Sequence, residues 1–173
     1  FTLSRLVPHK AVEDAIKAFA QIDTDTKLII IGAAPFNDTA YETMLQKLAQ
    51  KDPRVIMVGR QIGKELIQII ANAYAMIHPS RSEGLSVAVL EAMSYGKMVI
   101  MSDILENLEL IDHSGVAYSV GDVKALRDAI TWLLSDPAIV KERGIRARGV
   151  IERLYSWKSV VERTEAVYSS LCG

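Results

Sequence analysis

Short runs of apolar and β-branched residues alternate with helical patterns along nearly the whole of the 173-residue chain. The run Lys27–Ile31 is almost continuously apolar, which is typical of a parallel strand that helices cover on both faces. The pattern therefore predicts a parallel sheet. Strands are expected at Phe1–Leu6, Lys27–Ile31, Val55–Val58, Ala75–His78, Met98–Met101 and Val116–Tyr118.

The helical patterns fall between these strands, and Asp-Pro pairs end two of them. Such alternation predicts an α/β fold, a doubly wound parallel Rossmann-like sheet of about six strands, with two additional C-terminal helices. Helices are expected at Ala11–Gln21, Thr39–Lys51, Lys64–Asn72, Val87–Tyr95, Leu105–Ile111 and Val123–Ser135, then from Ala138 towards Leu154, and at Trp157–Leu171.

Composition narrows the functional classes. Twenty basic and 21 acidic residues give a formal net charge of −1, so charge favours neither nucleic acid nor an anionic membrane as a partner. The single cysteine, Cys172, excludes an internal disulfide, which fits a reducing compartment. No apolar stretch reaches the roughly 20 residues of a membrane-spanning helix, and no signal peptide is visible. The chain starts in a strand pattern without Met, so we expect that an N-terminal portion has been removed.

In doubly wound sheets, ligands bind beyond the carboxyl ends of the strands. Glu83 and Glu91 stand out there, because seven residues separate them and a helix is expected to open near Ser86. Free N–H groups at a helix start suit a phosphate. A carboxylate on either side can hold hydroxyl groups, which matches the sugar, diphosphate and ribose of a sugar nucleotide. Arg5 and Lys10 flank the turn after the first strand and can neutralise a diphosphate at the same edge.

Other residues argue against rival chemistries. The turn at Gly32 lacks the G-x-G-x-x-G pattern, so a nicotinamide or flavin cofactor is not expected. Asp23 and Asp25 lie at the amino edge of the predicted sheet, where turn residues are more typical than a metal site. Ser86 lacks the G-x-S-x-G context of a serine hydrolase. His78 ends a strand and is expected to be a hydrogen-bonded core residue, since the histidines His9, His78 and His113 lack metal-ligand spacing.

Six motifs that occur in order along the chain resemble one known family. The chain resembles the C-terminal, donor-binding domain of retaining GT-B glycosyltransferases of family 4 (glycosyl transferases group 1), over essentially all 173 residues. Several motifs in order are far more specific than any single one. They are SRLVPHK (residues 4–10), PSRSEGLS (79–86), LEAMSYG (90–96), VIMSD (99–103), GD (121–122) and YSW (155–157).

This resemblance implies transfer of a sugar from a nucleotide-diphosphate sugar to an acceptor, with retention of the anomeric configuration. Arg5 and Lys10 would contact the donor diphosphate and stabilise the leaving group, and Glu83 would hydrogen-bond the sugar hydroxyls. The donor would be a UDP-, GDP- or ADP-sugar, with no cofactor and no metal. The other donor-binding residues would be the turn glycines Gly32 and Gly84, the base-side residues Arg60 and Gln61, the backbone amides of Leu85, Ser86 and Val87, and the ribose-binding Glu91.

Some positions depart from the family pattern. Many members have Gly where this chain has Ala11, Gly is common where it has Ala33-Ala34, and Pro is frequent where it has Leu105. None of these positions is expected to touch the diphosphate or the carboxylates. The departures leave the base and the sugar open.

The family works in a cleft between two Rossmann domains, and residues 1–173 match only the C-terminal one. The N-terminal acceptor domain is therefore expected to be absent and the isolated fragment to be inactive. Expected partners are a nucleotide sugar, an acceptor glycan, lipid or small molecule, and the missing N-terminal domain, without nucleic acid. The expected location is cytoplasmic, with peripheral contact at the inner face of the membrane through the missing domain. The last helix, Trp157–Leu171, would cross back towards that domain and expose apolar side chains.

Three alternatives remain open at this point. The first is a non-catalytic nucleotide or sugar-phosphate binding module, because every site residue above serves binding as well as catalysis. The second is another GT-B chemistry, such as phosphorolysis or sugar-nucleotide epimerisation. The third, a flavodoxin-like signalling domain, is disfavoured because Ser4-Arg5 stands where that fold needs an acidic cluster.

Overall fold

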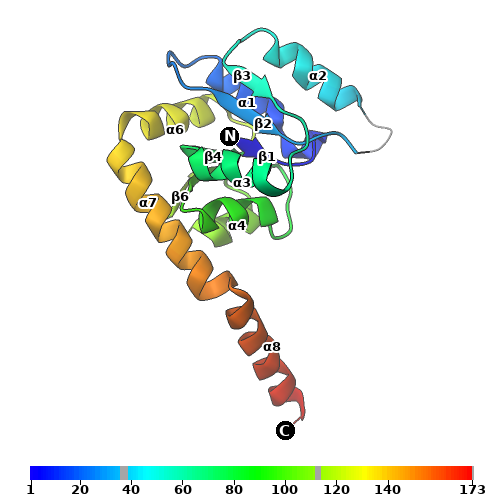
Figure 1. The fold of residues 1–173 in the computed structure, drawn as a ribbon, viewed down its shortest axis with the longest axis vertical. Coiled ribbons are helices and arrows are strands. Elements are labelled where there is room, and N and C mark those ends of the chain that lie inside the picture. Colours follow the sequence, from blue (N-terminus) through cyan, green and yellow to red (C-terminus); the bar gives the residue numbers. More distant parts are fainter. Residues whose placement is uncertain (36–38, 112–113, 173) are drawn as a thin grey trace.

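The computed structural model describes residues 1–35, 39–111 and 114–172 (Figure 1). All six expected strands form, and they pair in parallel as two three-stranded sheets. The first sheet contains β1 (Thr2–Leu3), β2 (Leu28–Ile31) and β3 (Val55–Met57), and the second contains β4 (Ala75–His78), β5 (Met98–Ser102) and β6 (Gly115–Tyr118).

The two sheets meet where β1 lies beside β4. The Ile77 N–H donates to the Phe1 carbonyl oxygen at 2.8 Å, and the Phe1 backbone nitrogen donates to the Ala75 carbonyl oxygen at 2.9 Å. The strands therefore lie in the order β3-β2-β1-β4-β5-β6, which is the order of a doubly wound Rossmann sheet. The predicted α/β fold is confirmed, and its two halves join between β1 and β4.

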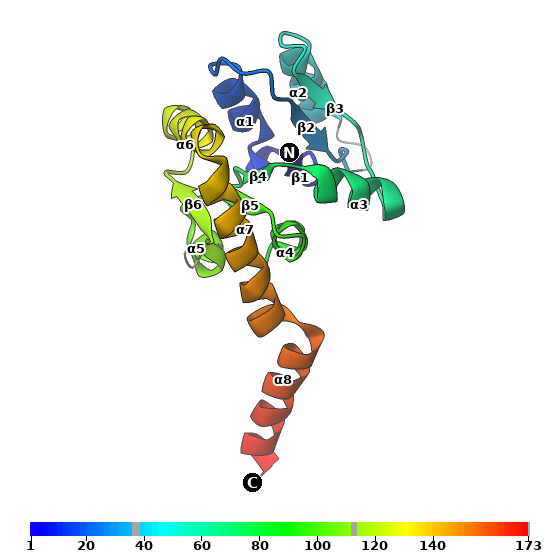
Figure 2. The same cartoon turned by 60° about the vertical axis from the view of Figure 1, so that its left-hand side comes forward.

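Each face of the sheet has its own buried cluster, because successive strand residues point to opposite faces. Met98 and Ile100 of β5 pack in one cluster and Val99 and Met101 in the other. Helices cover both faces, as the apolar run of β2 predicts (Figure 2). The first cluster is covered by α1 (Val12–Phe19), α2 (Ala40–Ala49) and α6 (Val123–Ser135), and the second by α3 (Gly63–Asn72), α4 (Val87–Ser94) and α5 (Leu105–Ile111).

The two expected C-terminal helices form but differ in their packing. The first is α7 (Pro137–Val150), which packs on β5 and α4 and continues into the π-helical turn η2 (Ile151–Tyr155). The second, α8 (Trp157–Cys172), contacts η2 and extends away from the sheet in both ribbon views (Figures 1 and 2). Its Trp157 is 85% exposed, and Val167 and Leu171 are exposed as well. The prediction that the last helix exposes apolar side chains is confirmed.

A pair of glycines sets how closely α7 approaches the turn between α4 and β5. A Cβ on Gly144 would overlap the carbonyl oxygen of Gly96. Gly96 has φ 68°, in the left-handed region that favours glycine. Gly149 lies in the same helix, yet a Cβ there would meet no atom within 4 Å. The close approach of α7 therefore requires glycine at position 144 and not at position 149.

We expect Gly144→Ala to lower the free energy of unfolding by about 1–3 kcal/mol, because the added methyl pushes α7 off its packing site. Gly149→Ala is the matched control and is expected to raise that free energy by up to about 1 kcal/mol, since alanine favours helix. Urea denaturation followed by circular dichroism measures both variants. Equal effects of the two substitutions would contradict the packing argument.

Candidate functional site

The loops that follow β1 and β4 lie against each other at the carboxyl edge of the sheet. The Arg81 N–H donates to the His9 carbonyl oxygen at 2.7 Å, and the Ser80 hydroxyl donates to the same oxygen at 3.2 Å. His9 belongs to the short 3-10 helix η1 (Pro8–Lys10), which precedes α1. These contacts hold Lys10 and Glu83 together although 73 positions of sequence separate them.

One oxygen of the Glu83 carboxylate meets two nitrogen-bearing side chains. The Lys10 ammonium donates to Glu83 Oε1 at 2.6 Å, and His78 Nε2 lies 2.8 Å from the same atom. The Glu83 side chain is 7% exposed and that of His78 is 2% exposed. The carboxylate is therefore anchored inside the molecule, between the end of β4 and the loop after β1.

The charge state of Glu83 follows from these neighbours. Burial alone would raise its pKa, but polar contacts with His78, Lys10 and Ser80, together with charge at His78, lower the pKa from 4.5 to about 2. Glu83 is ionised at neutral pH. A carboxylate already engaged in this way suits the acceptance of hydrogen bonds from hydroxyl groups.

The start of α4 offers backbone donors beside Glu83. The N–H groups of residues 84–88 have no hydrogen-bond acceptor among the described residues. Ser86, the residue before the helix, is buried and makes no side-chain cap, whereas Leu85 and Val87 are exposed. Unpaired N–H groups at a helix start attract anions, and phosphate in particular.

A cavity of about 460 Å³ lies at the carboxyl ends of β1 and β2, and Arg5, Gly32, Arg60 and Gln61 line it. Gly32 has φ 147°, and a Cβ there would overlap the Ser4 carbonyl oxygen, so glycine is required where the two strands end together. The Gln61 side-chain amide donates to a carbonyl oxygen of its own loop at 2.6 Å, while Arg5 is exposed.

The structure thus divides the predicted residues into groups. Lys10 and Glu83 are in contact, and Arg5 shares a cavity with the three residues that follow β2 and β3. Glu91 lies on α4 four positions after Val87, about one turn from the free N–H groups, and it is half-buried. Within residues 1–35, 39–111 and 114–172, no hydrogen bond or ion pair joins Glu91 to Lys10 or Glu83.

Sequence reasoning missed an ion-pair network that supports the loop after β4. Arg81 Nη2 lies 2.9 Å from Asp14 Oδ2 and 3.2 Å from Glu13 Oε1. The Tyr41 hydroxyl donates to the Glu13 carboxylate, so the network reaches from this loop through α1 to α2. Asp14 is buried. Asp14 lies on the side of α1 away from Val12, Ile16 and Phe19, so the helical pattern gave no signal of its burial, although a buried carboxylate needs a partner.

The prediction for His78 was correct in placing it in the core, but its contact with Glu83 was not foreseen. Its side chain is buried at the end of β4, as the strand pattern indicated. The expected hydrogen bond is replaced by a close approach to Glu83 Oε1 in which Nε2 lacks good hydrogen-bond alignment. His113 lies outside the described residues.

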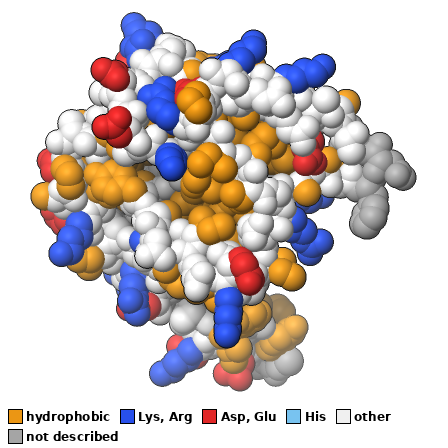
Figure 3. Space-filling view, turned by 45° about the horizontal axis from the view of Figure 1, so that its top comes forward, with side chains coloured by type: hydrophobic (Ala, Val, Ile, Leu, Met, Phe, Trp, Pro, Cys, Tyr) orange, Lys and Arg blue, Asp and Glu red, His pale blue; other side chains and the backbone are white. Residues whose placement is uncertain are grey.

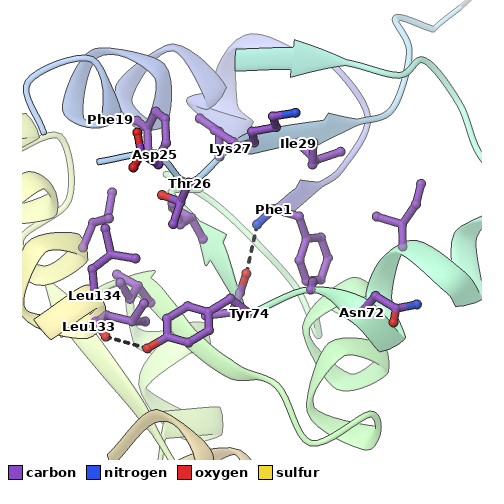
Figure 4. Close-up of a pocket in the computed structure, with 17 residues that line it drawn as sticks. Phe1, Phe19, Asp25, Thr26, Lys27, Ile29, Asn72, Tyr74, Leu133 and Leu134 are labelled. Carbon is purple, nitrogen blue, oxygen red and sulfur yellow. Dashed lines mark hydrogen bonds between the residues drawn. The ribbon is translucent and has the colours of Figure 1, made fainter. Parts of the chain in front are cut away.

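Other surfaces offer less chemistry. A cavity of about 420 Å³ at the amino ends of the strands is lined mainly by apolar side chains, with Asp25 at its edge, and holds none of the predicted site residues (Figure 4). On the face drawn in Figure 3, basic and acidic side chains are interspersed around an apolar centre. Among the described residues, no three His, Cys, Asp or Glu side chains gather to hold a metal ion. No described helix is both long and apolar enough to cross a membrane.

A Rossmann-like parallel sheet, with Lys10, Glu83 and the start of α4 at its carboxyl edge, has the architecture of a GT-B domain. The chain belongs to the glycosyl transferases group 1 family, whose pattern matches residues 1–150. It is 30% identical to N-acetyl-alpha-D-glucosaminyl L-malate synthase of Bacillus anthracis, over 92% of this chain and 42% of that protein.

A second relative and one solved structure also match nearly all of the chain over part of their own length. A GDP-mannose-dependent monoacylated alpha-(1-6)-phosphatidylinositol monomannoside mannosyltransferase of Corynebacterium glutamicum is 30% identical, over 96% of this chain and 46% of that protein. HepE of Anabaena, solved in complex with UDP, superposes with a TM-score of 0.89 at 23% identity, over 98% of this chain and 48% of that one. The chain therefore spans less than half the length of these relatives.

The contacts of Glu83 make stability depend on pH. A carboxyl group whose folded pKa is lowered contributes stability that is full above its unfolded pKa and is lost as pH falls. For Glu83 this window runs from 4.5 down to about 2. Glu83→Gln cannot titrate, so its deficit in unfolding free energy relative to wild type is expected to shrink across this window. Urea denaturation at a series of pH values measures the deficit, and a deficit independent of pH would count against the ionised contact.

Proposed function

We propose that the chain is the C-terminal, donor-binding half of a retaining family 4 glycosyltransferase, which transfers a sugar from a nucleotide-diphosphate sugar to an acceptor. The observation that carries this proposal is the meeting of Lys10, Glu83 and the free N–H groups of residues 84–88 at one edge of a parallel sheet. The relative from Corynebacterium is named as GDP-mannose-dependent, and HepE was solved with UDP, which supports a nucleoside diphosphate as the ligand class.

In this proposal each group of residues meets one part of the donor. Arg5, Lys10 and the N–H groups at the start of α4 bind the diphosphate and stabilise the negative charge that builds as it leaves. Glu83 accepts hydrogen bonds from sugar hydroxyls, and Glu91 does the same for the ribose. Arg60 and Gln61, in the loop after β3, lie beside the base.

Retention follows if the acceptor attacks the anomeric carbon from the side of the leaving group. The state of Glu83 supports this route over a covalent enzyme intermediate. Its carboxylate is tied to Lys10 and lies against His78, and its pKa is lowered to about 2, so it is a weak nucleophile. Glu83 orients the sugar, the bond to the leaving phosphate breaks as the acceptor oxygen bonds to the sugar, and the proton of the acceptor hydroxyl passes to the departing phosphate oxygen. We propose that the donor and these residues accomplish this without a metal or another cofactor.

The acceptor half is proposed to lie outside these 173 residues. The chain covers 42% to 48% of the three relatives above, which leaves room for a second domain. The exposed apolar residues of α8 are the surface that this domain would cover. The acceptor, whether a glycan, a lipid or a small molecule, and any peripheral contact with the inner face of the membrane would come through that half, in a cytoplasmic protein.

The donor site is tested by nucleotide binding to the 173-residue chain. UDP, GDP and ADP are compared by thermal unfolding, since a ligand at about 100 times its dissociation constant adds about 2.7 kcal/mol to the stability of the folded state. We expect at least one of them to raise the melting temperature. Arg5→Ala should weaken the best ligand by about tenfold or more, because a charge-assisted contact is lost. Arg153→Ala, an exposed arginine of η2, is the control. Equal binding by Arg5→Ala and wild type would contradict the assignment of Arg5.

The substitution Glu83→Gln in the full-length protein distinguishes a transferase from the competing function, a non-catalytic binding module. A transferase is expected to lose turnover by about tenfold to a thousandfold without any loss of affinity for the free nucleoside diphosphate, because Glu83 meets the sugar of the donor and its loss leaves Lys10 available to the diphosphate. Glu142→Gln, at an exposed position of α7, is the control. A full-length protein that binds the sugar nucleotide without turnover, and in which Glu83→Gln changes that affinity little, would fit the binding module instead.

A further inference from the structure

His78 is buried at the candidate site, and the proposed function above assigns it no role. Its side chain is 2% exposed, and Nε2 lies 2.8 Å from Glu83 Oε1. Even so, Nε2 makes no well-aligned hydrogen bond with any described residue. A buried polar atom that is close to an anion but not fully engaged is unusual and calls for a physical reason.

Two anions compete for the Lys10 ammonium in the proposed function: the Glu83 carboxylate and the donor diphosphate. In this structure its ammonium donates to Glu83 at 2.6 Å, but the proposed donor site needs the same ammonium at the diphosphate. When Lys10 turns to the diphosphate, the Glu83 carboxylate loses a close cation while its side chain stays almost wholly buried. A buried charge that loses its partner strongly destabilises a fold.

The other polar groups around Glu83 are already engaged. The Ser80 hydroxyl also lies near Glu83, but its proton is directed at the carbonyl oxygens of His9 and Ser82, at 3.2 and 2.9 Å. Arg81 is paired with Glu13 and Asp14. Among the described residues close to Glu83, His78 is therefore the one whose Nε2 is not yet used in a hydrogen bond and can donate to the carboxylate.

We propose that His78 is a positioning residue, which holds the Glu83 carboxylate in place while Lys10 binds the donor diphosphate. The proposal rests on the proposed function of this site. His78 lies in β4, where its backbone pairs with Met101 of β5, so its position is set by the sheet. Lys10 ends η1 in a loop, and its long side chain has freedom to move between two anions. The rigid imidazole keeps Glu83 in register for the sugar, and the mobile ammonium follows the phosphate.

A ligand-free test uses urea denaturation of the 173-residue chain near neutral pH. Lys10→Met keeps the length of the side chain but removes the ammonium, as if it had moved to the diphosphate. His78→Phe keeps a ring but removes both nitrogens. We expect His78→Phe to raise the unfolding equilibrium constant about tenfold more in the Lys10→Met background than in wild type. In the Glu83→Gln background, where no charge needs a partner, this extra effect should disappear.

The outcomes of that comparison are distinct. An equal effect of His78→Phe in all three backgrounds would mean that the ring only fills space, and it would overturn the proposal. His78→Gln, which retains an N–H donor, should recover part of the loss in the Lys10→Met background. The comparison needs no nucleotide, so it decides the role of His78 even if the chain binds no donor and the proposed function fails.

Nucleotide affinity gives a second test, which does not need the Lys10→Met background. His78→Phe alone should weaken binding of the free nucleoside diphosphate about tenfold, because Lys10 must then stay with Glu83. The same substitution in the Glu83→Gln background should have little effect. Isothermal titration calorimetry with UDP, GDP or ADP, whichever binds wild type best, measures both. Unchanged affinity in His78→Phe, or an equal loss in both backgrounds, would overturn the proposal.

Discussion

The pairing of β1 with β4 is the constraint on which the whole site depends. Two hydrogen bonds, from the backbone nitrogens of Ile77 and Phe1, join the halves of the sheet at this point. Because parallel neighbours end at the same edge, the loops after these two strands have to meet. Lys10 comes from one loop and Glu83 from the other, so their contact is a direct product of strand order. The loop after β2 joins them at the same edge because β2 is the other neighbour of β1.

The site combines short, buried side chains with longer, positively charged ones. The carboxylate of Glu83 and the imidazole of His78 are held by the sheet and by burial, and the hydrogen bonds of Ser80 and Arg81 fasten the loop between them. The cations Arg5 and Lys10 come from the end of β1 and from η1, where side chains are longer and less enclosed. Fixed groups suit the stereochemistry of a sugar, whereas adaptable cations suit a phosphate whose charge changes during transfer.

Much of this could be read from the sequence, and the exceptions have physical causes. Strands and helices were predicted because apolar runs and helical spacing report burial directly, and the motif spacing placed Lys10 and Glu83 at one edge. The ion pair of Arg81 with Asp14 joins positions 67 apart, and no local pattern encodes such a partner. The strand pattern around His78 likewise indicates that the side chain is buried, but it does not reveal that Glu83 is its partner. The expected helix towards Leu154 becomes π-helical from Ile151, a local change of helix type that the spacing of apolar residues does not indicate.

The backbone at Ala11 shows why this position beside the site can hold either alanine or glycine. Ala11 has φ 49°, a left-handed conformation that costs a residue with a Cβ about 1 kcal/mol. Its methyl group is also fully enclosed, and burying one such carbon returns about 0.8 kcal/mol. These terms almost cancel, so alanine and glycine are nearly interchangeable next to Lys10. A glycine at position 11 would therefore leave the stability of the fold almost unchanged, although the position lies directly beside Lys10 and its contact with Glu83.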